Sequence, residues 1–356
     1  MRTYATAVRR FTDSPVALQQ AGVLFWQRSL WRHRMLAMGD EEQPAAVVLR
    51  VQRRDDPVGA VTEDDAARRG AAYPNIRVGA PLFGHAVQAD AGRWRVHAVV
   101  SDTPQGARDN LAHRLREQRD ETNDPAVVVE LAAVLDVLDR EKVDEVVVDG
   151  RAYRIVRVDT FARFGPDGPE PPRPTGRDPR DAADHDSFLD ETIVIDPDAA
   201  TGMGEAMLRA ELITAHYPRA QVPADVYADS VAAVTSHPVG VVLPTRYAAA
   251  ECVDGSWRPY SRAVATPQLA RDEIAFGLRH IEPRLRRLTD EQATAYQRAA
   301  DNLDAEPVDE LTVLGHRLRV TRIETLLRMS TDGPEGPRPS DPDPDQPPAA
   351  DRHQQD

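Results

Sequence analysis

The chain has 356 residues, a single cysteine, Cys252, and a formal net charge of −14. One cysteine excludes an intrachain disulfide framework and a metal cluster built from cysteines. No apolar run is long enough to span a bilayer, so no transmembrane segment is expected. The acidity disfavours nucleic acid as a general partner. We therefore expect a cytoplasmic protein, and the length predicts two domains.

The first 35 residues carry six arginines and one aspartate. Ser14 and Pro15 suit the start of a helix, and Gly39 suits a C-terminal cap. We therefore predict a basic helix over residues 14–38, inside an N-terminal segment 1–44. The helix either docks on the body with its arginines in solvent, which we prefer, or binds a membrane surface or a nucleic acid.

A repeat dominates the rest of the chain. Residues 143–179 and 308–344 align without a gap at an offset of 165, and 18 of the 37 positions are identical. Upstream, GRWR (92–95) matches GSWR (255–258) and TPQGARDNLAHRLR (103–116) matches TPQLARDEIAFGLR (266–279). The pattern predicts a tandem duplication, with repeats at 45–164 and 191–330 in a pseudo-two-fold arrangement. The second repeat carries about 19 more residues, which we assign to TSHPVGVVLPTRY (235–247) and its flanks.

The first repeat predicts a strand at 45–52, a helix at 62–72, and strands at 81–88 and 93–100. Helices then begin at Thr103 and at Asp124, each followed by proline. A hairpin turns on Asp149–Gly150, and DTFARF (159–164) reads as a short helical turn.

The second repeat predicts strands at 191–196, 248–253 and 256–264, and helices at 201–215 and after Thr266. Thr289 and Gln292 form a capping box, a hairpin turns on Leu314–Gly315, and ETLLRM (324–329) reads as a helical turn. Because hairpins interrupt the alternation of strands and helices, we predict an α+β fold rather than a doubly wound sheet.

Two acidic, proline-rich segments follow the repeats: a linker at 165–190 and a tail at 331–356. Residues 165–192 and 331–356 each have a net charge of −5 and together hold 13 of the 29 prolines. Such a composition buries too little apolar surface to fold, so we predict that both are disordered. Their related GPDGPEPPRP and DGPEGPRP motifs are either spacers, which we prefer, or polyproline ligands for an aromatic groove on a partner or on the other repeat.

No catalytic signature is present: the sequence lacks GxSxG, P-loop, GxGxxG, HExxH and paired CxxC motifs. The candidate site residues are those that both repeats keep, which are Arg108, Asp109, Arg271, Asp272, Trp94 and Trp257. Either the arginines line a groove for an acidic ligand or, as we prefer, Asp109 and Asp272 accept from a nearby arginine and lock helix to hairpin, while the tryptophans anchor the core. Unpaired arginines that converge from both repeats would favour the groove.

The motifs TPQGARDNLAHRL, VDEVVVDGRAYRIVR and RFGPDGPEPPRPTGRDP, with their second copies, resemble a family of actinobacterial proteins of unknown function. The resemblance covers most of residues 45–344 and implies no catalytic residue, cofactor or substrate. We predict a non-enzymatic interaction or binding protein without a cofactor or metal. The alternative is a small-molecule binder or an enzyme that uses the cleft between the repeats. A protein partner, a homo-oligomer and a small molecule all stay open as partners.

Overall fold

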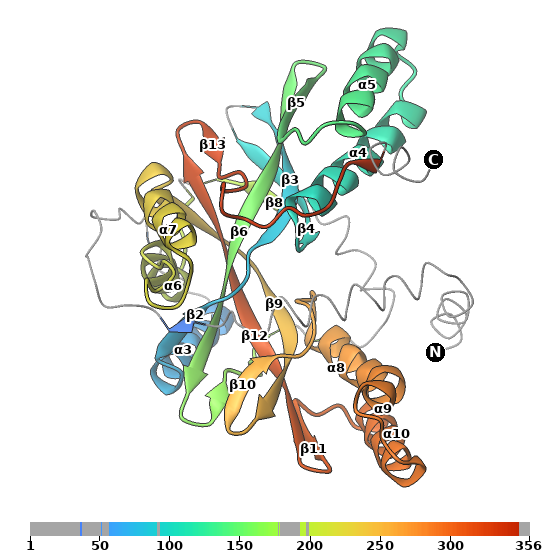
Figure 1. The fold of residues 1–356 in the computed structure, drawn as a ribbon. Helices are drawn as coiled ribbons and strands as arrows, with labels where there is room; N and C mark the ends of the chain where they lie inside the picture. Colours follow the sequence, from blue (N-terminus) through green and yellow to red (C-terminus); the bar gives the residue numbers. More distant parts are fainter. Residues whose placement is uncertain are drawn as a thin grey trace.

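A computed structural model of the chain describes residues 36–37, 51, 57–90, 93–176, 178, 193–196 and 199–348. Within these ranges thirteen strands join one sheet (Figure 1). The strands are β1 (Leu36–Ala37), β2 (Asn75–Val78), β3 (Leu82–Gln88), β4 (Trp94–Ser101), β5 (Glu145–Val148), β6 (Arg151–Gly165), β7 (Gly168–Pro169), β8 (Ile193–Ile195), β9 (Val239–Val253), β10 (Ser256–Pro259), β11 (Glu310–Val313), β12 (His316–Ser330) and β13 (Gly333–Pro334).

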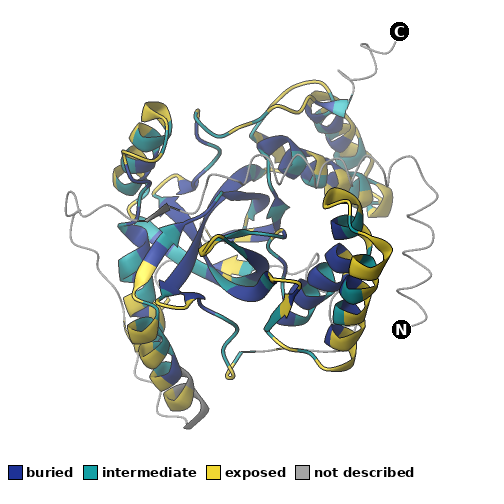
Figure 2. Cartoon of the chain, turned by 60° about the horizontal axis from the view of Figure 1, so that its bottom comes forward, coloured by how far each residue is buried: buried dark blue, intermediate teal, exposed yellow. Residues whose placement is uncertain are grey.

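The helices of the described ranges lie around this sheet, with their exposed residues facing outward around a centre of buried strands (Figure 2). They are α3 (Pro57–Ala72), α4 (Pro104–Glu121), α5 (Pro125–Leu138), α6 (Met203–Ile213), α7 (Ala224–Ser236), α8 (Pro267–Phe276), the π-helical turn η4 (Gly277–Ile281), α9 (Glu282–Leu285) and α10 (Asp290–Ala305). The α+β fold predicted from the hairpins is confirmed.

The centre of the sheet is the antiparallel pair of its two long strands, β6 and β12. Thr160 lies opposite Thr325, and these residues are 165 positions apart, which is the offset of the sequence repeat. Strands β3 and β4 continue the sheet beyond β6, and β9 and β10 continue it beyond β12. Each half of the sheet thus contributes one long strand to a shared middle.

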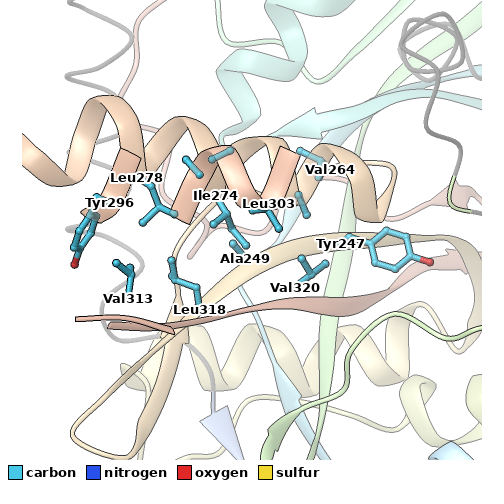
Figure 3. Packing of buried hydrophobic residues seen from close by; sticks show 13 residues of the cluster. Tyr247, Ala249, Val264, Ile274, Leu278, Tyr296, Leu303, Val313, Leu318 and Val320 are labelled. Atoms are coloured by element: carbon cyan, nitrogen blue, oxygen red, sulfur yellow. The ribbon is translucent and has the colours of Figure 1, made fainter. Parts of the chain in front are cut away.

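Each half has a helical layer with its own apolar core. Helices α4 and α5 bury Leu111 and Leu131 against Phe83 and Ile155 of the sheet. Helices α8 and α10 cover β9 and β12 in the same way around a cluster that includes Ile274 (Figure 3). The apolar stripes of the sequence predict these helix faces because residues three and four apart share one side of a helix.

The helix starts and hairpins follow the prediction. Thr103 and Thr266 accept hydrogen bonds from backbone amides in the first turns of α4 and α8, and the capping box of α10 is present. Asp149 and Leu314 each have a positive φ and are followed by a glycine with positive φ. This conformation is that of a type I′ turn, which matches the twist of the strands it joins.

The two predicted helical turns are wrong. Residues 159–164 and 324–329 belong to the second halves of β6 and β12, and the two strands pair there, Phe161 with Glu324 and Val158 with Leu327. Both faces of these strands are buried. A strand buried on both faces does not alternate apolar and polar residues, so its pattern resembles that of a short buried helix.

The extra residues of the second repeat are not those we assigned. Val239 pairs with Met329 of β12, as Asn75 pairs with Phe164 of β6. Residues 239–247 therefore belong to strand β9 and have counterparts in the first half. The added segment is α7 and its connections, between AHYP (215–218), which resembles AAYP (71–74), and the start of β9.

Disorder is the wrong prediction for the described parts of the linker and the tail. Residues 165–176, Asp178 and residues 331–348 are described, and Glu170, Glu335 and Arg338 among them are buried. The remainder of the linker and tail lies outside the described residues. The predicted N-terminal helix also lies outside them, apart from Leu36–Ala37, which form the short strand β1 instead of the end of a helix.

Candidate functional site

The two candidate arginines are buried and paired. Arg108 donates to Asp144 of its own half at 2.7 Å and to Asp343 of the tail at 2.8 Å. Arg271 donates to Asp309 at 2.6 Å and to Asp178 of the linker at 2.7 Å. Each guanidinium therefore joins a helix, the start of a hairpin and the acidic segment that follows the other half. These pairs favour the structural interpretation over the arginine-lined groove.

The candidate aspartates accept hydrogen bonds from glutamines four residues earlier on the same helices. Asp109 accepts from the side-chain nitrogen of Gln105 at 3.0 Å, and Asp272 accepts from Gln268 at 2.9 Å. Adjacent residues on a helix point in different directions, whereas residues four apart lie on one face. Burial raises the pKa of Asp109. The aspartates that lock helix to hairpin are Asp144 and Asp309, which the repeated VDE motif contains.

Each candidate tryptophan contacts the proline-rich segment that follows the other half of the protein. Trp94 is buried and Trp257 is half-buried. A β-carbon on Gly333 would lie 2.8 Å from the Trp94 ring, and one on Gly168 would lie 2.2 Å from Trp257 Nε1. Both glycines also have positive φ, so only glycine fits. The preferred spacer interpretation is wrong for these residues, since each proline-rich segment passes over an aromatic side chain of the other half.

Main-chain hydrogen bonds also join each proline-rich segment to the other half of the protein. The Glu170 amide donates to the carbonyl oxygen of Arg163 in β6, and the Glu170 carbonyl oxygen accepts from the Arg322 amide of β12. Both distances are 2.8 Å. In the tail, the Glu335 amide donates to the carbonyl oxygen of Arg328 in β12, and the Glu335 carbonyl oxygen accepts from the Arg157 amide of β6. Both distances are 2.9 Å. In Figure 1 the red C-terminal segment runs from β13 across β6 to α4. The described linker and tail thus stabilise the junction of the halves.

A cluster of buried charges lies beside this junction. Asp159 accepts from Arg328 at 2.9 Å and also pairs with Arg157, and both arginines are 1% exposed. Arg157 reaches Asp341 of the tail at 2.9 Å. These guanidinium groups hold the pKa of Asp159 well below its usual range, despite the burial that opposes this.

A second cluster of buried charges, around Glu324 of β12, pairs arginines with carboxylates in the same way. Glu324 pairs with Arg322 at 2.7 Å, and Glu170 pairs with Arg173 at 2.7 Å. The charges of Arg322 and Arg173 lower the pKa of Glu324. Because the repeated arginines at the junction face carboxylates of this chain, their charge is already neutralised and is not available to an acidic ligand.

A buried histidine pair belongs to the first half only. The His85 and His97 rings stack with centroids 5.5 Å apart. Burial lowers the pKa of His85 to about 3 and that of His97 to about 4. The nearby charge of Arg114 acts in the same direction on both. Both rings are therefore neutral at pH 7 in the folded protein.

This pair should make the protein sensitive to acid. The histidines bind protons in the unfolded chain below pH 6.5 but not in the folded chain until about pH 4 and 3, so folding stability falls as the pH drops through this window. His85→Gln should reduce the proton uptake on unfolding near pH 5 by about one proton. The slope of unfolding free energy against pH measures this uptake, and an unchanged slope would contradict the assignment.

The second half contains a cluster of histidine, glutamate and tyrosine side chains that was not predicted from the sequence. His316 Nε2 lies 3.0 Å from Glu251, and His316 Nδ1 lies 3.3 Å from the Tyr296 hydroxyl. All three residues are buried. Since both ring nitrogens have partners within the protein, the cluster acts as a brace between β9, β12 and α10. These residues do not recur in the first half, so the repeat gives no signal for them.

An apolar pocket lies where the two halves meet. Its cavity volume is about 30 Å³, inside a hollow of about 550 Å³ that includes open solvent. Small and apolar residues of both halves line it, together with two threonines: Gly79, Ala80, Leu82, Thr160, Phe161, Ala162, Pro169, Ala248, Ala249, Ala250, Pro259, Ala263, Thr321 and Ile323.

The same surface of the other half is filled. The strand register relates three positions of the two halves. Ala86, Val96 and Arg154 of the first half correspond to Ala250, Pro259 and Arg319 of the second half, where Ala250 and Pro259 line the pocket. At the related positions a core cluster holds Val96, Val156, Val158 and Leu327, in place of the pocket residues Pro259, Thr321, Ile323 and Ala162. Two of these differences matter for the pocket: alanine replaces leucine at Ala162, which removes side-chain volume, and threonine replaces valine at Thr321, which adds a hydroxyl. The repeat search missed this site because it looked for residues that the halves share.

The described residues form an α+β protein whose charged groups brace its own segments and whose pocket is apolar. In these residues no helix is long and apolar enough to cross a membrane, and no group of three or more metal-ligating side chains could hold a metal ion. A family model described as "Family of unknown function (DUF5954)" matches residues 56–344, and the chain belongs to this family. No curated protein and no solved structure matches the chain.

Proposed function

We propose that this protein is a non-enzymatic binding protein whose pocket between the halves takes a small apolar molecule. The observation that carries the proposal is the pocket itself, which is open where the related surface of the other half is filled by Leu327 and three valines. Pockets of small-molecule binding proteins are concave and mostly apolar. The pairing of Arg108 and Arg271 with carboxylates supports binding of a neutral ligand rather than an acidic one.

We further propose that the halves, 45–164 and 191–330, arose by tandem duplication and that the protein is cytoplasmic. Support for the duplication comes from the offset of 165 residues at Thr160 and Thr325, and from the reciprocal contacts of Glu170 and Glu335. In this interpretation one half kept its apolar core and the other exchanged it for a binding pocket.

Calorimetric titration of the full chain with toluene tests the binding function. Toluene should bind with one-to-one stoichiometry and a negative heat-capacity change, because apolar surface is buried. Ala162→Leu should abolish this binding, since leucine is the residue that fills the related position in the other half. Ala132→Leu, on the exposed face of α5, is the matched control and should bind like the wild type. Absence of toluene binding to the wild type would refute the proposal.

The same two positions give opposite predictions for stability. Leu327 is fully buried, so Leu327→Ala should lower the unfolding free energy by about 2–5 kcal/mol. Ala162→Leu should change it by less than about 1 kcal/mol, because the added atoms enter existing space. Urea denaturation measures both. A loss of several kcal/mol for Ala162→Leu would mean that the pocket cannot accommodate the added side chain.

A further inference from the structure

One polar side chain of the pocket has no hydrogen-bond partner among the described residues. Thr321 is 2% exposed, and its hydroxyl oxygen is buried without such a partner. The preceding residue, Val320, packs under the helices of the second half (Figure 3). Since neighbouring residues of a strand point to opposite faces, Thr321 points away from those helices, toward the side on which it lines the pocket. A buried hydroxyl without a partner is unfavourable, so such a group calls for an explanation.

The other half shows that the hydroxyl is not needed for packing. Val156 occupies the related position and is buried in an apolar cluster. Valine and threonine have nearly the same shape and differ mainly in that one methyl group is replaced by a hydroxyl. The open half therefore carries a polar group that its filled counterpart lacks.

The other hydroxyl at the pocket is already used. Thr160 donates to the carbonyl oxygen of Ala80 at 2.7 Å, and Thr325, its counterpart, donates in the same way to Pro244 at 3.0 Å. Among the side chains that line the pocket, Thr321 alone offers a hydrogen-bonding group that the described residues do not satisfy.

No charged side chain lines the pocket. The nearest basic residue on the same face of β12, Arg319, donates to Glu310 at 2.7 Å and to the Pro169 carbonyl oxygen at 3.0 Å. A charged ligand would lose its hydration without gaining a counterion, which is costly in an apolar site. The pocket therefore selects against carboxylates, phosphates and amines.

We propose that the ligand is a neutral, mainly apolar molecule with one hydroxyl or carbonyl group, and that Thr321 is the specificity residue that hydrogen-bonds this group. This inference rests on the proposed binding function and names the class of ligand. A hydroxyl both donates and accepts, so either group satisfies Thr321 Oγ1.

The test compares two probes of similar size, toluene and phenol, with benzoate as the charged probe. The affinity of each for the wild type and for Thr321→Val is measured by calorimetric titration of the full chain at pH 7. We expect Thr321→Val to lower the ratio of phenol to toluene affinity roughly tenfold, which is the effect of one hydrogen bond in a water-poor site. Thr321→Ser keeps the hydroxyl and should keep the wild-type ratio. Benzoate should bind more weakly than either neutral probe.

The outcomes separate the two proposals. If toluene binds and the ratio of phenol to toluene affinity is the same in wild type and Thr321→Val, the role of Thr321 is wrong while the binding function stands. Tighter binding of benzoate than of phenol would overturn the neutral ligand class. If neither neutral probe binds the wild type, both proposals fail. A melting curve of Thr321→Val shows whether the variant is folded, and Val156 shows that the fold accepts valine at the related position.

Discussion

Replacing Asp159 by asparagine should lower the unfolding free energy by about 3–5 kcal/mol. Asp159 is 5% exposed and is the shared partner of Arg157 and Arg328, each 1% exposed. The substitution removes the carboxylate that pairs with buried Arg328 and leaves Arg157 with Asp341 as its remaining counterion. Loss of one partner of a buried pair is far more costly than loss of an exposed pair, because the remaining charge cannot be solvated.

Guanidinium denaturation of the variant and of Asp136→Asn measures this effect. Asp136 forms an exposed pair with Arg140 at 2.7 Å, so its substitution should change stability by less than about 1 kcal/mol. The lowered pKa of Asp159 means that its contribution is fully present above the unfolded-state pKa near 3.9 and is lost as the pH falls through the lower folded-state pKa. Equal effects of the two substitutions would contradict the buried cluster.

Ending the chain at residue 330 should destabilise it on the order of 5 kcal/mol. The truncation removes the tail partners of two buried arginines, Asp343 of Arg108 and Asp341 of Arg157, and the main-chain bond from Arg157 to Glu335. It also uncovers Trp94, which lies under Gly333. The loss should therefore appear in the first half of the protein, far from the cut in sequence.

A chain ended at residue 348 is the matched control, since it keeps every one of these contacts. Its melting temperature should stay within about 1 °C of the full chain, whereas that of the chain ended at 330 should fall by many degrees. Tryptophan fluorescence adds a local readout, because exposure of Trp94 shifts its emission to longer wavelength. An unchanged melting temperature after truncation at 330 would restore the view of the tail as a spacer.

Local sequence signals predicted the elements well where the chemistry is local. Thr103, Thr266 and the capping box of Thr289 mark helix starts because their side chains bond to amides three residues away. Asp149–Gly150 marks a turn because the required dihedral angles belong to those two residues. These interactions need no knowledge of the rest of the fold.

The candidate site was predicted only in part. The repeat identified Arg108, Arg271, Trp94 and Trp257, and it led us to expect that Asp109 and Asp272 are the aspartates that lock helix to hairpin. Their partners are Asp144 and Asp309, and the tail and linker aspartates, which lie between 36 and 235 residues away. Such partners depend on how strands and segments cross in three dimensions, which spacing along the chain does not encode.

The sequence by itself determined the helix caps, the hairpin turns, the α+β class and the similarity of two segments at an offset of 165 residues. Only the tertiary structure decided that acidic, proline-rich segments are ordered, because their stability comes from arginines and tryptophans of the other half rather than from their own composition. It alone showed the pocket too. A pocket is space left between residues from six strands and their connections, and whether small side chains leave such space depends on what packs opposite them.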